Sequence, residues 1–220
     1  RVSSPAVARR AALMLGTSLS FLAGGQYLNH DMLVAAWIGI AIWSFALAFL
    51  HGERPHAGWA RLGFAACALG LLAKGLIGLA LPGLVLLLWL LATRQMGKVL
   101  RLPWLSGLAI FAAIALPWFV LAELKHPGLF DYLFGVQQFG RYTGTTFNNA
   151  RPVWFYLPVL AGLLFPWFIF ILNQLKPPVQ QADIAIDSIA RSVWLLCWIW
   201  IVAIVGFFSV PHSKIVGYVL

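Results

Sequence analysis

Long apolar runs separated by short polar stretches dominate the chain. Most of these runs are close to the roughly 20 residues that a helix needs to cross a membrane. The pattern therefore predicts an all-α membrane protein with several spans. The apolar runs cover residues 11–28, 31–50, 62–92, 104–122, 153–172 and 192–210.

The run 62–92 does not fit a standard span, because its 31 residues are too many for one crossing and few for two. Lys74 and Gly75 stand near its middle, and Pro82 follows. These residues predict a hairpin of two short or broken helices. Non-helical backbone at such a depth is tolerated only where protein or water covers it.

The distribution of basic residues supports this hairpin, since loops on the cytoplasmic side carry an excess of Lys and Arg. If 62–92 crosses twice, ten of the fifteen basic residues fall on one side, whereas a single crossing splits the basic loops between both sides. We therefore expect about seven membrane passages. The basic residues on the outer side are then Lys74, Lys125, Arg141, Arg151 and Lys214.

Two longer polar stretches connect the spans. Residues 123–152 contain aromatic side chains at moderate spacing, which predicts an amphipathic helix lying along the outer interface. Residues 174–190 are polar and contain prolines, and we expect a linker on the cytoplasmic side.

Composition strengthens the membrane assignment. The chain is 62% hydrophobic and 10% charged, whereas a soluble domain is about 25% charged. The net charge of +9 does not indicate nucleic-acid binding, because most basic residues lie in short loops between spans. Cys67 and Cys197 lie inside apolar runs, which argues against a disulfide or a redox motif.

The chain begins with Arg1 and ends within an apolar stretch at Leu220. We expect an internal fragment of a longer protein, with residues 1–220 forming one partial transmembrane domain.

Three outer cations are candidates for binding a lipid phosphate: Lys74, Arg141 and Lys214. Cations near the ends of membrane helices are costly to desolvate and usually have an anionic partner or a function. Arg can clamp a phosphate with two parallel hydrogen bonds, and Gly75 lets a ligand approach the backbone near Lys74. The alternative is that Lys74 snorkels to the interface and that the other two contact lipid headgroups.

Asp31 opens a span after Asn29 and His30. It has two interpretations. A carboxylate here can cap the free backbone amides of the helix and favour its dipole. It can also act as a base, or orient a sugar donor or acceptor. The spacing does not decide between them.

Other candidate chemistry is weaker. His30, His126 and His212 could join Asp31 in a metal site, but no pair has ligand spacing on one helix, so unrelated surface histidines remain the alternative. Phosphate loops and nucleophile elbows are absent from the sequence. Glu123 and Asp131 flank the outer loop and are expected to be solvated or capping residues.

Seven short motifs follow one another in a recognisable order from residue 29 to residue 220. They are Asn-His-Asp-Met-Leu at 29–33, Gly-Leu-Leu-Ala-Lys-Gly-Leu-Ile-Gly at 70–78, Leu-Pro-Trp-Phe-Val-Leu at 116–121 with His-Pro-Gly-Leu-Phe-Asp-Tyr at 126–132, Phe-Gly-Arg-Tyr at 139–142, Pro-Val-Trp-Phe-Tyr-Leu-Pro-Val-Leu at 152–160, Phe-Pro-Trp at 165–167, and Phe-Ser-Val-Pro-His-Ser-Lys-Ile-Val-Gly-Tyr-Val-Leu at 208–220. The series resembles bacterial lipid-dependent glycosyltransferases related to the aminoarabinose transferase of lipid A and to protein O-mannosyltransferases.

The resemblance implies a GT-C fold, a multi-spanning helical bundle with its active site at the outer face. Such enzymes take a sugar from a polyprenyl-phosphate donor and transfer it to a lipid, glycan or protein acceptor. For this chain it implies a bacterial inner membrane protein with a periplasmic active face, surrounded by membrane lipids and with no nucleic-acid partner.

The resemblance also assigns roles to particular residues. Asp31 matches the family's Asp at the start of a span and is the catalytic candidate. Lys74 matches the Lys of its Lys-Gly turn. Arg141, followed by Tyr142, matches the outer-loop motif, and Lys214 and Tyr218 match a Ser-Lys-x-x-x-Tyr element. These residues would hold the lipid phosphate or shape the donor pocket.

The sequence departs from the family pattern at two positions. Gln138 stands where the family often carries a His, near which relatives can hold a metal ion, so a divalent metal cofactor is not implied here. Val216 replaces a Pro. The family's principal catalytic acid is expected upstream of Arg1. The implied mechanism is inversion at the anomeric carbon.

Two other functions remain open at this point. A transporter or flippase for lipid-linked sugars would use the same cations but would favour charges halfway along spans. A non-catalytic membrane scaffold would explain the hydrophobicity but not the basic residues on the outer side.

Overall fold

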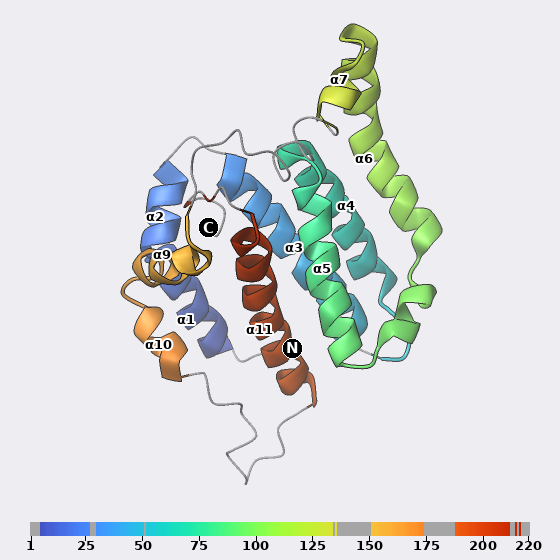
Figure 1. Ribbon diagram of the computed structural model, residues 1–220. Helices are drawn as coiled ribbons and strands as arrows, with labels where there is room; N and C mark the ends of the chain where they lie inside the picture. The colour runs from blue at the N-terminus through green and yellow to red at the C-terminus, as the bar shows by residue number, and fades with distance from the viewer. Residues whose placement is uncertain are drawn as a thin grey trace. The chain divides into compact units, whose positions relative to one another are not determined.

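The computed structural model describes residues 5–26, 30–50, 52–133, 135, 151–173, 188–211, 214 and 216, and within these ranges every regular element is a helix (Figure 1). Three helices are long and apolar enough to cross a membrane: His30–Leu50, Trp104–Lys125 and Ile189–Ser209, with mean hydropathies of 2.3, 2.2 and 2.2. The predicted all-α fold is confirmed.

The chain divides into two compact units. One consists of His30–Ala150, and the other combines Arg1–Asn29 with Arg151–Leu220. The two are described separately below, as the central unit and the terminal unit.

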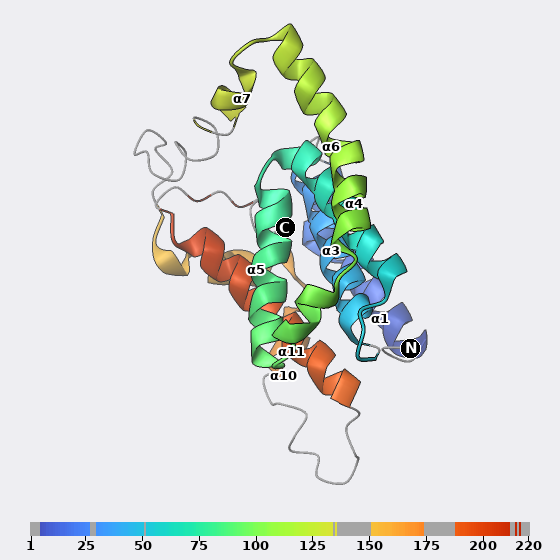
Figure 2. The same ribbon diagram turned by 90° about the vertical axis from the view of Figure 1, so that its right-hand side faces the viewer.

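Four helices form the central unit, and each runs in the opposite direction to the one before it: α3 (His30–Leu50), α4 (Ala57–Lys74), α5 (Ile77–Ala92) and α6 (Trp104–Lys125). Helix α4 packs against the other three, as Figures 1 and 2 show from two directions. Helices α4 and α5 are the predicted hairpin, and Gly75 ends α4 with a φ of 77°. That backbone conformation suits glycine, which has no Cβ to clash.

Small residues let α4 and α5 approach closely near the hairpin turn. A Cβ added to Gly78 of α5 would collide with the backbone of Gly70 in α4. Close backbone approach at small residues is typical of helix packing in membranes, where burial of apolar surface gives little driving force. The hairpin is therefore fixed by backbone contact at its closed end.

Aromatic side chains fill the space between α3, α4 and the start of α6. The rings of Phe45 and Phe64 meet edge to face, with centroids 5.3 Å apart, and Phe64 meets Trp104 in the same way at 5.5 Å. Such edge-to-face pairs add stability beyond the area they bury.

The connections at the other end of the central unit carry basic residues that bond the backbone. Lys98, in the short helix η1 (Met96–Arg101), donates to the carbonyl oxygens of Phe49 and Gly52 at 3.2 and 2.9 Å. Arg101 donates to the Glu53 carbonyl oxygen at 3.3 Å. The loops after α3 and α5 therefore lie at the same end of this unit, as the double crossing requires.

The outer stretch after α6 begins with a turn that a carboxylate stabilises. Helix α6 continues to Lys125, a turn follows, and α7 comprises only Leu129–Asp131. The Glu123 carboxylate accepts hydrogen bonds from the backbone N–H groups of Gly128 and Phe130, both at 2.7 Å. Glu123 is thus a capping residue, as predicted. The described residues that follow the turn, 129–133 and 135, are helical, and the amphipathic helix expected along the interface stays a prediction. Residues 134 and 136–150 lie outside the described residues.

The terminal unit begins with α1 (Pro5–Gly16) and α2 (Leu19–Gln26), which divide the apolar run 11–28. Hydroxyl groups account for the break. Thr17 Oγ1 donates to the Leu13 carbonyl oxygen at 2.6 Å, and Ser18 Oγ accepts from Phe21 N–H at 3.4 Å. Ser18 therefore caps α2, which favours a new helix over continuation of α1.

The run 153–172 is also divided, into η3 (Val153–Phe155), α9 (Tyr156–Leu163) and α10 (Phe168–Asn173). The turn between α9 and α10 contains Pro166, and Leu19 N–H donates to the Phe165 carbonyl oxygen at 3.3 Å. The last helix, α11 (Ser188–Ser209), is continuous, as predicted. Tyr156 and Leu196 are fully buried in this unit.

Candidate functional site

An ion pair joins two of the predicted site residues in the central unit. The Lys74 ammonium contacts the Asp31 carboxylate. The side chain of Asp31 is 9% exposed and that of Lys74 is 27% exposed. The carboxylate is therefore enclosed by protein, whereas the ammonium still reaches the surface.

Helix ends position both side chains. Asp31 lies in the first turn of α3, where the helix dipole favours a negative charge, and Lys74 lies in the last turn of α4, where it favours a positive one. Because α3 and α4 are antiparallel neighbours, these ends meet. The sequence analysis identified each residue as a candidate, but it did not predict that the two form an ion pair.

In this pair the Asp31 carboxylate compensates the positive charge of Lys74, so the ammonium can lie next to a ligand. Lys74 is oriented by Asp31 and can accept a second, external anion on its exposed side. The Gly75 backbone beside it has no side chain to obstruct the approach. The arrangement suits a phosphate or another compact anion.

Lys214 has a different environment, in the terminal unit. It is 4% exposed, and its ammonium donates to the carbonyl oxygens of Arg151 and Pro211 at 3.1 and 2.7 Å. Arg151 itself is exposed, with its guanidinium carbon 5.7 Å from the centre of the Phe155 ring. The sequence placed Arg151 on the outer side but did not single it out as a site residue.

Three predicted site residues, Arg141, Tyr142 and Tyr218, lie outside the described residues. His212 does as well. His30 and His126 are exposed, and the described part of the chain contains no cluster of three His, Cys, Asp or Glu side chains that could hold a metal.

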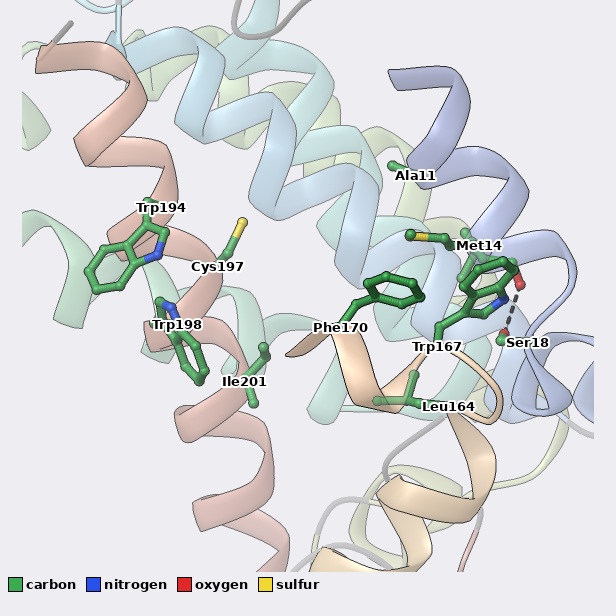
Figure 3. A pocket seen from close by; sticks show the side chains of 11 residues that line it. Ala11, Met14, Ser18, Leu164, Trp167, Phe170, Trp194, Cys197, Trp198 and Ile201 are labelled. Carbon is green, nitrogen blue, oxygen red and sulfur yellow. Dashed lines mark hydrogen bonds between the residues drawn. The ribbon is translucent and has the colours of Figure 1, made fainter. Parts of the chain in front are cut away.

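A cavity of about 630 Å³ lies within the terminal unit, between α1, α10 and α11 (Figure 3). Its lining is almost entirely apolar and includes Met14, Trp167, Trp194, Cys197 and Trp198. None of the side chains that line it is charged. Because catalysis of group transfer depends on groups that stabilise developing charge, this cavity does not provide the chemistry.

Comparison with known proteins identifies a family that this chain matches. The family model for dolichyl-phosphate-mannose-protein mannosyltransferases matches residues 2–133, more than half of the chain. This range contains α1 to α6 and both members of the ion pair.

Similar sequences extend the match over nearly the whole chain. The undecaprenyl phosphate-alpha-4-amino-4-deoxy-L-arabinose arabinosyl transferases of Erwinia tasmaniensis and Aeromonas salmonicida are 30% and 31% identical over 212 and 219 residues. Each alignment covers 96% of this chain. The chain spans only 37% and 38% of the length of these relatives.

The fold is that of a solved relative. The crystal structure of ArnT from Cupriavidus metallidurans bound to undecaprenyl phosphate is 30% identical in sequence and has a TM-score of 0.78. The match covers 94% of this chain and 37% of the ArnT chain. The apo structure gives 28% identity and a TM-score of 0.74. The GT-C-like helical fold predicted from the motifs is confirmed. This membrane protein belongs to the dolichyl-phosphate-mannose-protein mannosyltransferase family.

Proposed function

We propose that residues 1–220 form part of the membrane domain of a glycosyltransferase. The enzyme transfers a sugar from a polyprenyl-phosphate donor to lipid A, another glycan or a protein. The observation that carries this proposal is the match in sequence and fold to ArnT, whose crystal structure contains undecaprenyl phosphate. By the same likeness we place the enzyme in the bacterial inner membrane, with its active face towards the periplasm.

The donor phosphate is the ligand that the candidate cations suit best. We assign Lys74, Arg141 and Lys214 to its recognition, with Tyr142 and Tyr218 shaping the donor site. The ion pair in the central unit supports the role of Lys74, because the ammonium is held in one place yet remains partly exposed. Pre-positioned charge stabilises a transition state without the cost of reorganisation.

The reaction replaces the bond between the anomeric carbon and the phosphate oxygen by a bond to an acceptor oxygen. The acceptor attacks from the face opposite the phosphate, which inverts the configuration. A carboxylate removes the acceptor proton, and the polyprenyl phosphate leaves with the bonding electrons. The cations balance the negative charge that grows on the leaving phosphate.

Asp31 is the catalytic candidate among the described residues. Its carboxylate is already bound to Lys74, so its contribution in the resting site is to orient that ammonium. An incoming phosphate competes for Lys74 and thereby weakens the hold of Lys74 on Asp31. This exchange would make the carboxylate available beside the donor sugar.

The positions of charges support a transferase over a transporter. The three membrane-length helices carry charged side chains only in their first or last turns, at Asp31, Glu123, Lys125 and Arg191. A transporter for charged lipid-linked sugars needs polar groups along its path through the membrane. The described helices favour chemistry at one face.

The test is to supply the protein, expressed from its own reading frame, with radiolabelled polyprenyl-phosphate sugar in proteoliposomes. We expect label to become covalently attached to an acceptor such as lipid A. Movement of intact donor across the bilayer without covalent transfer would support a transporter and overturn the proposal. Neither movement nor transfer, with every acceptor class supplied, would overturn it as well.

A further inference from the structure

The buried ammonium of Lys214 has no carboxylate partner among the residues that the structure describes. Among the described residues of the terminal unit there is no aspartate or glutamate. The two acids that its sequence contains, Asp183 and Asp187, both precede Ser188. Both lie outside the described residues.

Burying such a charge is costly. Carbonyl dipoles from Arg151 and Pro211 compensate part of the desolvation of Lys214, but they do not neutralise it. Buried charges in proteins are normally paired with an opposite charge. The surroundings of Lys214 therefore favour an anion nearby.

Arg151 is the group best placed to contact that anion. Its backbone carbonyl is held by Lys214, while its own side chain is exposed. The guanidinium lies over the Phe155 ring, a position that restricts its orientation. A guanidinium held in this way loses less freedom on forming two parallel hydrogen bonds to a phosphate.

We propose that Arg151 binds the phosphate group of a membrane lipid, with Lys214 as the positioning residue. Lys214 fixes the Arg151 backbone through the carbonyl and adds a second positive charge from a site of low dielectric constant. The identification of the anion as a lipid phosphate rests on the proposed function. Both the polyprenyl-phosphate donor and a phosphorylated acceptor lipid carry this group.

The first experiment measures binding of farnesyl phosphate and of farnesol to the protein in phosphatidylcholine nanodiscs. Arg151→Met should raise the Kd for farnesyl phosphate by at least about tenfold, the loss expected for a hydrogen bond to a charged group. It should leave farnesol binding unchanged. Arg151→Lys should restore part of the affinity, since lysine keeps the positive charge but cannot form two parallel hydrogen bonds to the phosphate.

Lys214→Met tests the positioning role. It should weaken farnesyl phosphate binding and also lower thermal stability, because it breaks two buried contacts. Arg191→Met is the matched control, since Arg191 is an exposed cation at the other end of α11, and it should bind both ligands as the unmodified protein does. Unchanged farnesyl phosphate binding in Arg151→Met would overturn the proposal, and so would an equal loss of farnesol binding.

Competition separates the two sources of phosphate. Displacement of farnesyl phosphate by undecaprenyl phosphate alone assigns the site to the donor, and displacement by phosphatidic acid as well assigns it to lipid phosphates in general. Either result supports the site provided that it depends on Arg151. Because these are binding measurements, Arg151-dependent phosphate binding without sugar transfer would contradict the proposed function alone. Sugar transfer without an effect of Arg151→Met on binding would contradict this inference alone.

Discussion

At the scale of single residues, the contact between Asp31 and Lys74 gives Asp31 a partner that the sequence did not predict. Asp31 lies in the first turn of α3, where a negative charge favours the helix dipole, and it also contacts a cation from another helix. The dipole and the cation both favour a carboxylate at this end of the helix. Neither residue can therefore be changed without affecting the other.

The pair should be coupled in stability. Lys74→Met leaves the Asp31 carboxylate largely enclosed and unpaired, so it should destabilise the protein, by less than the roughly 3–5 kcal/mol of a fully buried pair because Lys74 is 27% exposed. Asp31→Asn in the same chain removes the unpaired charge. The double variant should then melt at a higher temperature than Lys74→Met alone. Thermal unfolding in detergent measures both.

Sugar transfer gives the second measurement on the same variants. Transfer should be lost in Lys74→Met and should stay lost in the more stable double variant, because the charge at the phosphate is missing in both. If the double variant recovers transfer along with stability, Lys74 has a structural role only.

The sequence predicted these residues but not their geometry. Lys74, Asp31 and Lys214 could be nominated because a charged residue at the end of an apolar run is unusual. The contact between Asp31 and Lys74 depends on how α3 and α4 pack, and the hold of Lys214 on Arg151 depends on tertiary structure. Neither leaves a local pattern in the chain, so residue spacing could not predict them.

At the scale of elements, the hairpin of α4 and α5 was predictable and the broken helices were not. The length of the run 62–92 and the Lys74-Gly75 pair indicated a turn, which the structure places at Gly75. The runs 11–28 and 153–172 gave no comparable signal in hydrophobicity. Their breaks depend on hydroxyl groups at Thr17 and Ser18 and on the turn around Pro166.

Two glycines of α5 give a matched test of the hairpin contact. Gly78→Ala should destabilise the protein by about 1–3 kcal/mol, the usual cost of overpacking, because its Cβ would meet the backbone of Gly70, which cannot move aside. Gly83→Ala should be neutral or slightly stabilising, since its Cβ meets nothing within 4 Å and alanine favours a helix. Thermal unfolding of both variants checks the difference. Equal melting temperatures would contradict the close approach of α4 and α5.

At the scale of the whole molecule, charge and topology lead to the same arrangement in the central unit. Lys98 and Arg101 bond the backbone of the loop after α3, whereas the contact of Lys74 with Asp31 lies at the opposite end. The positive-inside rule assigns the first end to the cytoplasm. The ion pair, and with it the chemistry, is then expected on the outer face.

Cysteine labelling in spheroplasts tests this orientation. The background carries Cys67→Ala and Cys197→Ala, which removes both thiols of residues 1–220. Gly97 precedes α6 and Lys125 is its last residue, and both are exposed. The 22 residues of α6 span about 33 Å, and a Cβ at Gly97 meets nothing within 4 Å. A membrane-impermeant maleimide should label Lys125→Cys in intact spheroplasts, and it should label Gly97→Cys only after lysis. The opposite pattern would place Lys74 on the cytoplasmic side, where a donor presented at the outer face could not reach it. Labelling of both positions before lysis would show that α6 does not cross the membrane.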